Sequence, residues 1–143
     1  MKPKKILVVE DEKAVQEYFR DILKSAGYEV LTAGTAVTAV NLARVEEPDL
    51  ITLDIKLSMD SSDGSWDGLS VVTWLRRLNA TKPPPIVVIS GTPDPGNAIE
   101  KALEAGIYTY LAKPVERERL LNVIAEALKN KSSDQIKLPQ IES

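Results

Sequence analysis

The stretch Pro48-Asp49-Leu50-Ile51-Thr52-Leu53-Asp54 decides the fold that this sequence predicts. It is short, apolar at consecutive positions, and it ends in an acid. A strand-length run without alternation is typical of a parallel strand covered on both faces. Open α/β sheets carry their chemistry at the carboxyl ends of such strands. We therefore predict a buried strand over residues 49–53, with Asp54 at its functional end.

Similar runs and helical periodicities continue the pattern in both directions. We predict strands over residues 5–9, 28–32, 49–53, 86–89 and 108–112, and helices over residues 12–26, 35–45, 69–78, 97–105 and 116–130. Gly27 and Gly106 suit the ends of two of these helices. Strand and helix alternate five times, which indicates an α/β fold with a five-stranded parallel sheet and helices on both faces.

Composition excludes several classes of protein and site. The 143 residues are 43% hydrophobic and 27% charged, which fits one globular domain. A net charge of -3 argues against direct nucleic-acid binding by this domain. The chain contains neither cysteine nor histidine, so any metal would have oxygen ligands. No segment is apolar enough for a signal peptide or a membrane span, and we expect a cytoplasmic protein.

Residues 131–143 are polar and have no clear period. We expect them to form a flexible tail or the start of a linker after a domain at residues 1–130.

Charged and hydroxyl side chains gather at the predicted carboxyl ends of the strands. They are Glu10 and Asp11, Asp54, Ser90, and Lys113. Neighbouring carboxylates repel one another unless a cation or a raised pKa relieves them, and oxygen ligands suit Mg²⁺, with Mn²⁺ as the alternative. Lys113 and Ser90 can reach phosphoryl oxygens, and Gly91 leaves that approach uncrowded. Asp54 would then be the nucleophile that forms an acyl phosphate.

Four segments in order carry a family resemblance: Val8-Val9-Glu10-Asp11-Glu12, the stretch from Pro48 to Asp54, Val88-Ile89-Ser90-Gly91, and Tyr110-Leu111-Ala112-Lys113-Pro114. Together they resemble the receiver domains of two-component response regulators, including the chemotaxis regulators. The resemblance implies a flavodoxin-like (βα)5 sandwich with strand order 2-1-3-4-5.

The resemblance also implies a role for each residue at the magnesium site. Asp54 aligns with the phosphoacceptor and Asp11 with a direct metal ligand. Glu10 stands where the family usually has aspartate and would help to organise the metal, often through water. Lys56 would contribute only its backbone carbonyl.

Further residues align with the phosphate-binding and switching positions. Lys113 aligns with the phosphate-binding lysine, and its bond to Pro114 is expected to be cis. Ser90 aligns with the switch hydroxyl and Tyr110 with the switch aromatic. Phosphorylation would then reshape the surface formed by the fourth helix, fifth strand and fifth helix.

The implied partners follow from this chemistry. The phosphoryl donor would be a sensor histidine kinase or a histidine phosphotransfer protein, and the reader a downstream effector domain or protein. A homodimer is a further arrangement that we keep open. Beyond transfer from a donor and slow self-dephosphorylation, no enzyme activity is expected.

The segment after Asp54 departs from the family. Ser58 replaces a usual proline, and the glycine aligned with Gly68 comes late, so the loop over residues 57–67 is enlarged. Asp63-x-Ser65-x-Asp67-Gly68 copies the start of a calcium loop, but Trp74 at the twelfth position cannot ligate. We favour a solvated or partner-shaped loop over calcium binding. Lys56 is either a solvated lysine or a cation that influences the phosphoryl group.

Simpler and rival interpretations stay open beside this one. Glu10 and Asp11 could cap a helix, Tyr110 could only pack in the core, and Trp74 could pack or meet a partner. A pseudo-receiver would bind partners without phosphorylation. A phosphatase of the haloacid dehalogenase type also begins with a strand-end aspartate, but it requires a second acid where this chain has Lys56.

Overall fold

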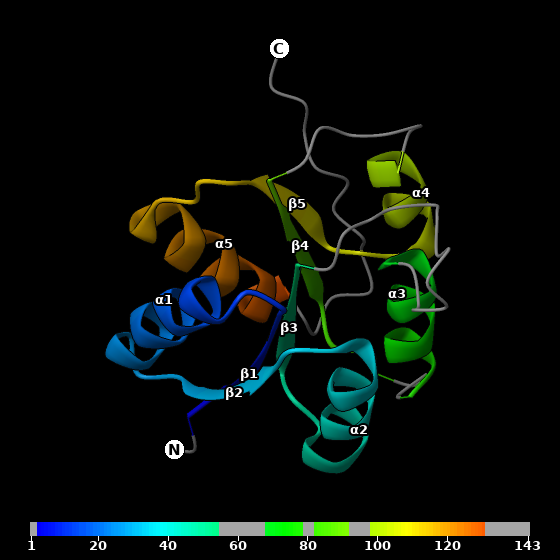
Figure 1. Ribbon diagram of the computed structural model, residues 1–143, viewed down its shortest axis with the longest axis horizontal. Coiled ribbons are helices and arrows are strands. Elements are labelled where there is room, and N and C mark those ends of the chain that lie inside the picture. The colour runs from blue at the N-terminus through cyan, green and yellow to red at the C-terminus, as the bar shows by residue number, and fades with distance from the viewer. Residues whose placement is uncertain (1–2, 55–67, 79–81, 92–97, 131–143) are drawn as a thin grey trace.

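The computed structural model describes residues 3–54, 68–78, 82–91 and 98–130. Within them, five parallel strands form one sheet in the order β2-β1-β3-β4-β5 (Figure 1). The strands are β1 (Lys5–Glu10), β2 (Glu29–Ala33), β3 (Leu50–Asp54), β4 (Ile86–Ser90) and β5 (Thr109–Ala112). The predicted α/β class and the strand order 2-1-3-4-5 are confirmed.

Within the same described ranges, five helices cover the two faces of this sheet. They are α1 (Lys13–Ser25), α2 (Ala36–Glu46), α3 (Gly68–Arg77), α4 (Ala98–Ala105) and α5 (Arg117–Lys129). Figure 1 shows α1 and α5 on one side of the sheet, with α2, α3 and α4 on the other. In the part of the chain that the structure describes, no helix is both long and apolar enough to cross a membrane.

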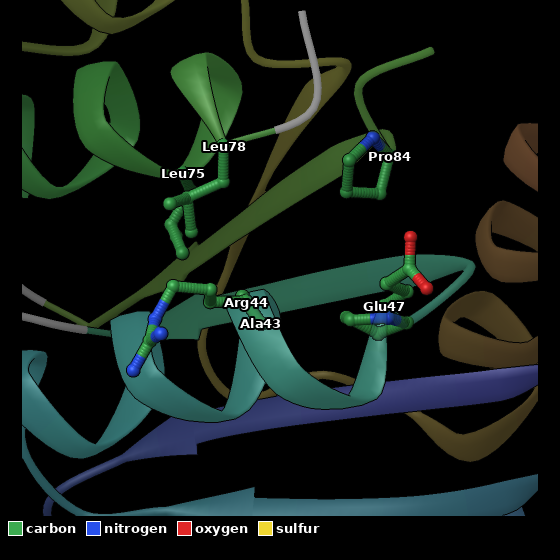
Figure 2. A pocket seen from close by; sticks show the side chains of 7 residues that line it. Ala43, Arg44, Glu47, Leu75, Leu78 and Pro84 are labelled. Atoms are coloured by element: carbon green, nitrogen blue, oxygen red, sulfur yellow. The ribbon is translucent and has the colours of Figure 1, made fainter.

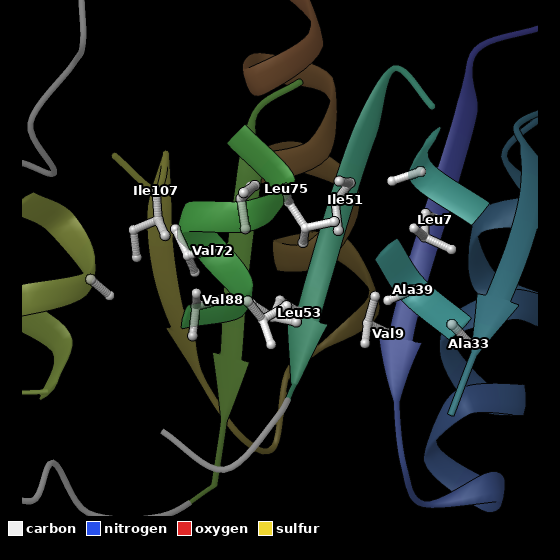
Figure 3. Close-up of a cluster of buried hydrophobic side chains, with 14 residues drawn as sticks. Leu7, Val9, Ala33, Ala39, Ile51, Leu53, Val72, Leu75, Val88 and Ile107 are labelled. Atoms are coloured by element: carbon white, nitrogen blue, oxygen red, sulfur yellow. The ribbon is translucent and has the colours of Figure 1, made fainter. Parts of the chain in front are cut away.

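Successive strand residues enter two separate cores, one under each helical layer. In β1, Leu7 and Val9 join the cluster beneath α2, α3 and α4, which Figure 3 shows. Ile6 and Val8 join the cluster beneath α1 and α5. Full burial of each such side chain contributes about 1.5–3 kcal/mol. Because both faces of the central strands are buried, apolar residues follow one another in β1, β3 and β4, which explains the lack of alternation in the sequence.

The observed strand ends refine the predicted ones. Glu10, Asp54 and Ser90 are each the last residue of a strand rather than the first residue after it. Ladder pairing, which depends on the backbone, extends one residue past the apolar run in each case. The polar side chains at these positions are therefore held by the sheet itself.

The sequence of α2 predicts a buried stripe of Ala36, Val37, Val40 and Ala43, and the structure differs from it at Val37. Ala39 and Ala43 are the buried residues, whereas Val37 is 59% exposed. The small alanine side chains face the sheet, so the two larger valines Val37 and Val45 lie on the outer side. In α3, Val71, Val72 and Leu75 are buried and Trp74 is about half exposed.

A small hollow lies between α2 and α3 (Figure 2). Two of its residues, Pro48 and Pro84, come just before β3 and β4, so it opens at the amino ends of these strands. It holds about 50 Å³ of free space, which is room for only a few water molecules. The hollow therefore plays no part in the site at the carboxyl edge.

Candidate functional site

Three strand ends bring Glu10, Asp54 and Lys113 into contact. Glu10 and Asp54 lie opposite each other in the β1–β3 pair. Lys113 follows β5, and its ammonium group forms an ion pair with the Asp54 carboxylate. The same Nζ atom lies 3.1 Å from Glu10 Oε1. One cation thus bridges two carboxylates that the register of the sheet would otherwise leave facing each other.

The side chain of Lys113 lies against Gly91 where it extends toward Asp54. Because β4 lies between β3 and β5, the lysine must cross the end of β4 to meet Asp54. A Cβ atom added at Gly91 would lie 3.4 Å from both Cβ and Cδ of Lys113. We expected the glycine to leave room for an approach to phosphorus. In the structure the stem of Lys113 also lies against this glycine; the open approach to phosphorus stays a prediction.

Burial and hydrogen bonding set the charge state of this pair. The Glu10 side chain is only 1% exposed, and its Oε2 accepts a hydrogen bond from the Glu12 backbone N–H at 2.9 Å. Burial is the largest influence on Glu10 and raises its pKa; the hydrogen bond with Asp54 raises it further. Burial would lower the pKa of Lys113, but its pairing with Asp54 and Glu10 outweighs this and raises it. Lys113 is therefore charged at neutral pH.

Asp11 is not brought into this carboxylate pair. Its side chain is exposed, and among the residues that the structure describes no three acidic groups are arranged as a metal site. The donor chemistry still suits Mg²⁺, which needs only one or two carboxylates and keeps several waters. Asp54 and Asp11 supply such oxygens at one edge, while both oxygens of Glu10 already accept hydrogen bonds. Lys56 and the loop 57–67 lie outside the described residues.

The two predicted switch residues lie on neighbouring strands. Ser90 ends β4, is 5% exposed, and its carbonyl accepts a hydrogen bond from the Lys113 N–H at 3.0 Å. Tyr110 lies in β5 and packs, half-buried, against the core beneath α2, α3 and α4. The expected cis bond between Lys113 and Pro114 is confirmed.

The N-terminal helix contributes a residue that the sequence did not reveal. Gln16, in the first turns of α1, donates a hydrogen bond from Nε2 to the Glu10 carbonyl at 3.0 Å. A glutamine in a helical period carries no sign of such a contact. Glu12 is the N-cap of α1 but makes no side-chain cap bond. Instead, the Glu10 carboxylate accepts a hydrogen bond from the Glu12 N–H at the start of α1. The interpretation of Glu10 as a helix-capping residue is therefore correct in part.

The sequence matches the response regulator receiver domain family over residues 6–125, which is most of the chain. The chain belongs to this family. A curated relative, the polar-differentiation response regulator DivK of Brucella anthropi, is 30% identical over 126 residues. That alignment covers 88% of this chain and 97% of DivK.

Solved receiver structures support the same assignment. The CheY-like receiver domain protein of Methanospirillum hungatei has a TM-score of 0.78 at 27% identity, over 93% of this chain and 99% of the other. The receiver domain of a Pseudomonas aeruginosa sensor histidine kinase has a TM-score of 0.73 at 29% identity. That alignment covers 89% of this chain and 98% of the other, which holds a magnesium ion in its active-site cleft.

Proposed function

We propose that this receiver domain accepts a phosphoryl group on Asp54 in a Mg²⁺-dependent reaction. Receiver domains are generally signalling domains rather than enzymes, and they interact with histidine kinases and downstream effectors. The observation that carries the proposal is the contact of Lys113 with both Asp54 and Glu10. It holds a fixed cation beside a strand-end carboxylate, where charge develops during phosphoryl transfer.

The transfer step uses groups of this chain and a phosphohistidine donor. A carboxylate oxygen of Asp54 attacks phosphorus, the P–N bond to the donor imidazole breaks, and an O–P bond forms. The released imidazole nitrogen takes up a proton. The ammonium group of Lys113, which pairs with the unphosphorylated Asp54 carboxylate, then binds a phosphoryl oxygen. The hydroxyl of Ser90 donates a hydrogen bond to another phosphoryl oxygen.

Asp11, Asp54 and the carbonyl of Lys56 would hold Mg²⁺, with Glu10 acting through water. The ion would neutralise charge on the phosphoryl oxygens. The magnesium ion in the P. aeruginosa receiver supports this assignment by analogy.

The output would pass through α4, β5 and α5. The phosphoryl group draws Ser90 toward it, and Tyr110 changes its packing, which alters this surface for an effector domain or protein. Moving such a switch from mostly off to mostly on requires about 5 kcal/mol of differential stabilisation. We also infer that the receiver domain spans residues 1–130, in support of which the family match ends at residue 125 and α5 at Lys129.

Incubation with acetyl phosphate and Mg²⁺, followed by intact-protein mass spectrometry, tests the proposal. We expect a gain of one phosphoryl group that requires the metal and disappears in Asp54→Asn. No gain in the wild type would favour a pseudo-receiver. Steady hydrolysis of phosphate esters would favour a phosphatase.

A further inference from the structure

The turn between β1 and α1 is tied together by one side chain from the helix. Glu10 is the last residue of β1, and the ladder to β2 ends one residue earlier, at the Val9–Ala33 pair. Gln16 Nε2 binds the Glu10 carbonyl at 3.0 Å. A Cβ atom added at Gly34 would lie 3.9 Å from that carbonyl oxygen and 4.0 Å from Nε2. The amide thus binds the carbonyl on the side where strand pairing stops.

The same glutamine is also bonded to the other end of the turn. Its backbone N–H donates to the Glu12 carbonyl at 2.9 Å. The Glu12 N–H in turn donates to Glu10 Oε2 at 2.9 Å. Asp11 lies between these two fixed residues, and its own side chain is exposed. The position of the Asp11 backbone is therefore set by the bonds on either side of it.

We propose that Gln16 is a positioning residue for divalent-cation binding. By holding the Glu10 carbonyl, it fixes the backbone that carries the side chains of Glu10, which lies opposite Asp54 in the sheet, and of Asp11, the next residue. The inference rests on the proposed function, since it assumes that a cation binds at this edge. Gln16 itself does not touch the cation or the phosphoryl group.

Two variants of Gln16 separate the effect of its hydrogen bond on cation affinity from the effect of an added charge. Gln16→Met keeps the length of the side chain but removes both N–H donors. Gln16→Glu places an acceptor against the Glu10 carbonyl, which is repulsive, yet its added negative charge alone would favour a cation. Loss of one hydrogen bond corresponds to about a fivefold change in an equilibrium constant. We expect both variants to bind the cation about fivefold more weakly than the wild type.

The experiment titrates Mn²⁺ into the folded protein without any phosphodonor. Water-proton relaxation reports how much Mn²⁺ is bound. Asn122→Ala, at an exposed amide on α5, is the matched control and should leave the affinity unchanged. Urea unfolding in EDTA reports any loss of stability separately. A purely structural role would lower stability and leave the Mn²⁺ affinity of the folded variants unchanged, which would overturn the inference.

Two further outcomes distinguish this inference from the proposed function. If Asp54→Asn weakens Mn²⁺ binding but neither Gln16 variant does, the positioning role is wrong and the proposed function stands. If Gln16→Glu binds Mn²⁺ more tightly than the wild type, the added negative charge affects binding more than the lost hydrogen bond to the Glu10 carbonyl does. The inference is then also wrong. If the wild type binds no Mn²⁺, both are overturned.

Discussion

Lys113 is the residue on which the geometry of the site depends. Its ammonium group lies between two carboxylates, one of them almost completely buried. We expect Lys113→Met to reduce the free energy of unfolding by about 1–3 kcal/mol in EDTA, because buried charges lose their partner. Urea denaturation at neutral pH measures this change.

Lys5→Met is a matched control for that experiment. Lys5 is about as exposed as Lys113, at 26% against 24%, and it also pairs with two acids, Glu29 and Glu46. These acids are exposed at 51% and 37%, so water replaces the lost partner and the cost should stay below about 1 kcal/mol. Equal losses in the two variants would contradict the account of a buried bridge at Lys113.

Because of Glu10, we expect the free energy of unfolding of the metal-free protein to depend on pH. Burial raises its pKa above the usual 4.5, so the folded state holds this proton more tightly than the unfolded state. The resulting stabilisation is fully present below pH 4.5 and is lost as the pH rises through the folded-state pKa. Relative to Glu10→Gln, the wild type should lose stability over that interval. Urea denaturation of both proteins in EDTA as a function of pH measures this; a constant difference would show that the Glu10 pKa is unshifted.

At the scale of elements, a hydrogen bond joins α3 to the turn that follows α4. Arg76 Nη1 donates to the Gly106 carbonyl at 2.8 Å. Gly106 has a φ of +107°, and an added Cβ would lie 2.5 Å from Arg76 Nε. The cationic side chain also lies at the C-terminal end of α4, where a positive charge is favourable. This contact joins α3 to the turn between α4 and β5.

Gly106→Ala tests this contact against Gly27→Ala. Gly27 has a similar φ of +96° but nothing within 4 Å of an added Cβ, so its substitution costs about 1 kcal/mol from backbone strain alone. Gly106→Ala must also displace Arg76 from its hydrogen bond and should cost about 1 kcal/mol more. Thermal or urea unfolding measures both. Equal costs would mean that the Arg76 contact contributes nothing.

The elements show where prediction from sequence succeeds. Strand-length apolar runs separated by helical periods made all five strands predictable, and with them the acids Glu10 and Asp54 at the ends of β1 and β3. The exposed face of α2 was not, because alanines are too weakly apolar to mark which side is buried. Contacts such as Gln16–Glu10 and Arg76–Gly106 join residues through the folded chain, and no local pattern encodes them.

For the molecule as a whole, the sheet explains why the site is where it is. The order β2-β1-β3-β4-β5 puts β1 and β3 side by side, so that Glu10 and Asp54 share one edge. Lys113 reaches them from β5 across the end of β4. Helices cover both faces of the sheet, and these charged side chains meet at its carboxyl edge. The fold thus creates the carboxylate pair and supplies its cation from a distant part of the chain.

Locating the phosphoryl group on the chain tests the central claim most directly. After reaction with acetyl phosphate and Mg²⁺, borohydride reduction converts an aspartyl phosphate to homoserine, and peptide mass spectrometry identifies the modified position. The account predicts homoserine at position 54 and nowhere else in the wild type. Reduction at another acid, such as Asp11 or Glu10, or none under conditions that phosphorylate a known receiver domain, would contradict it.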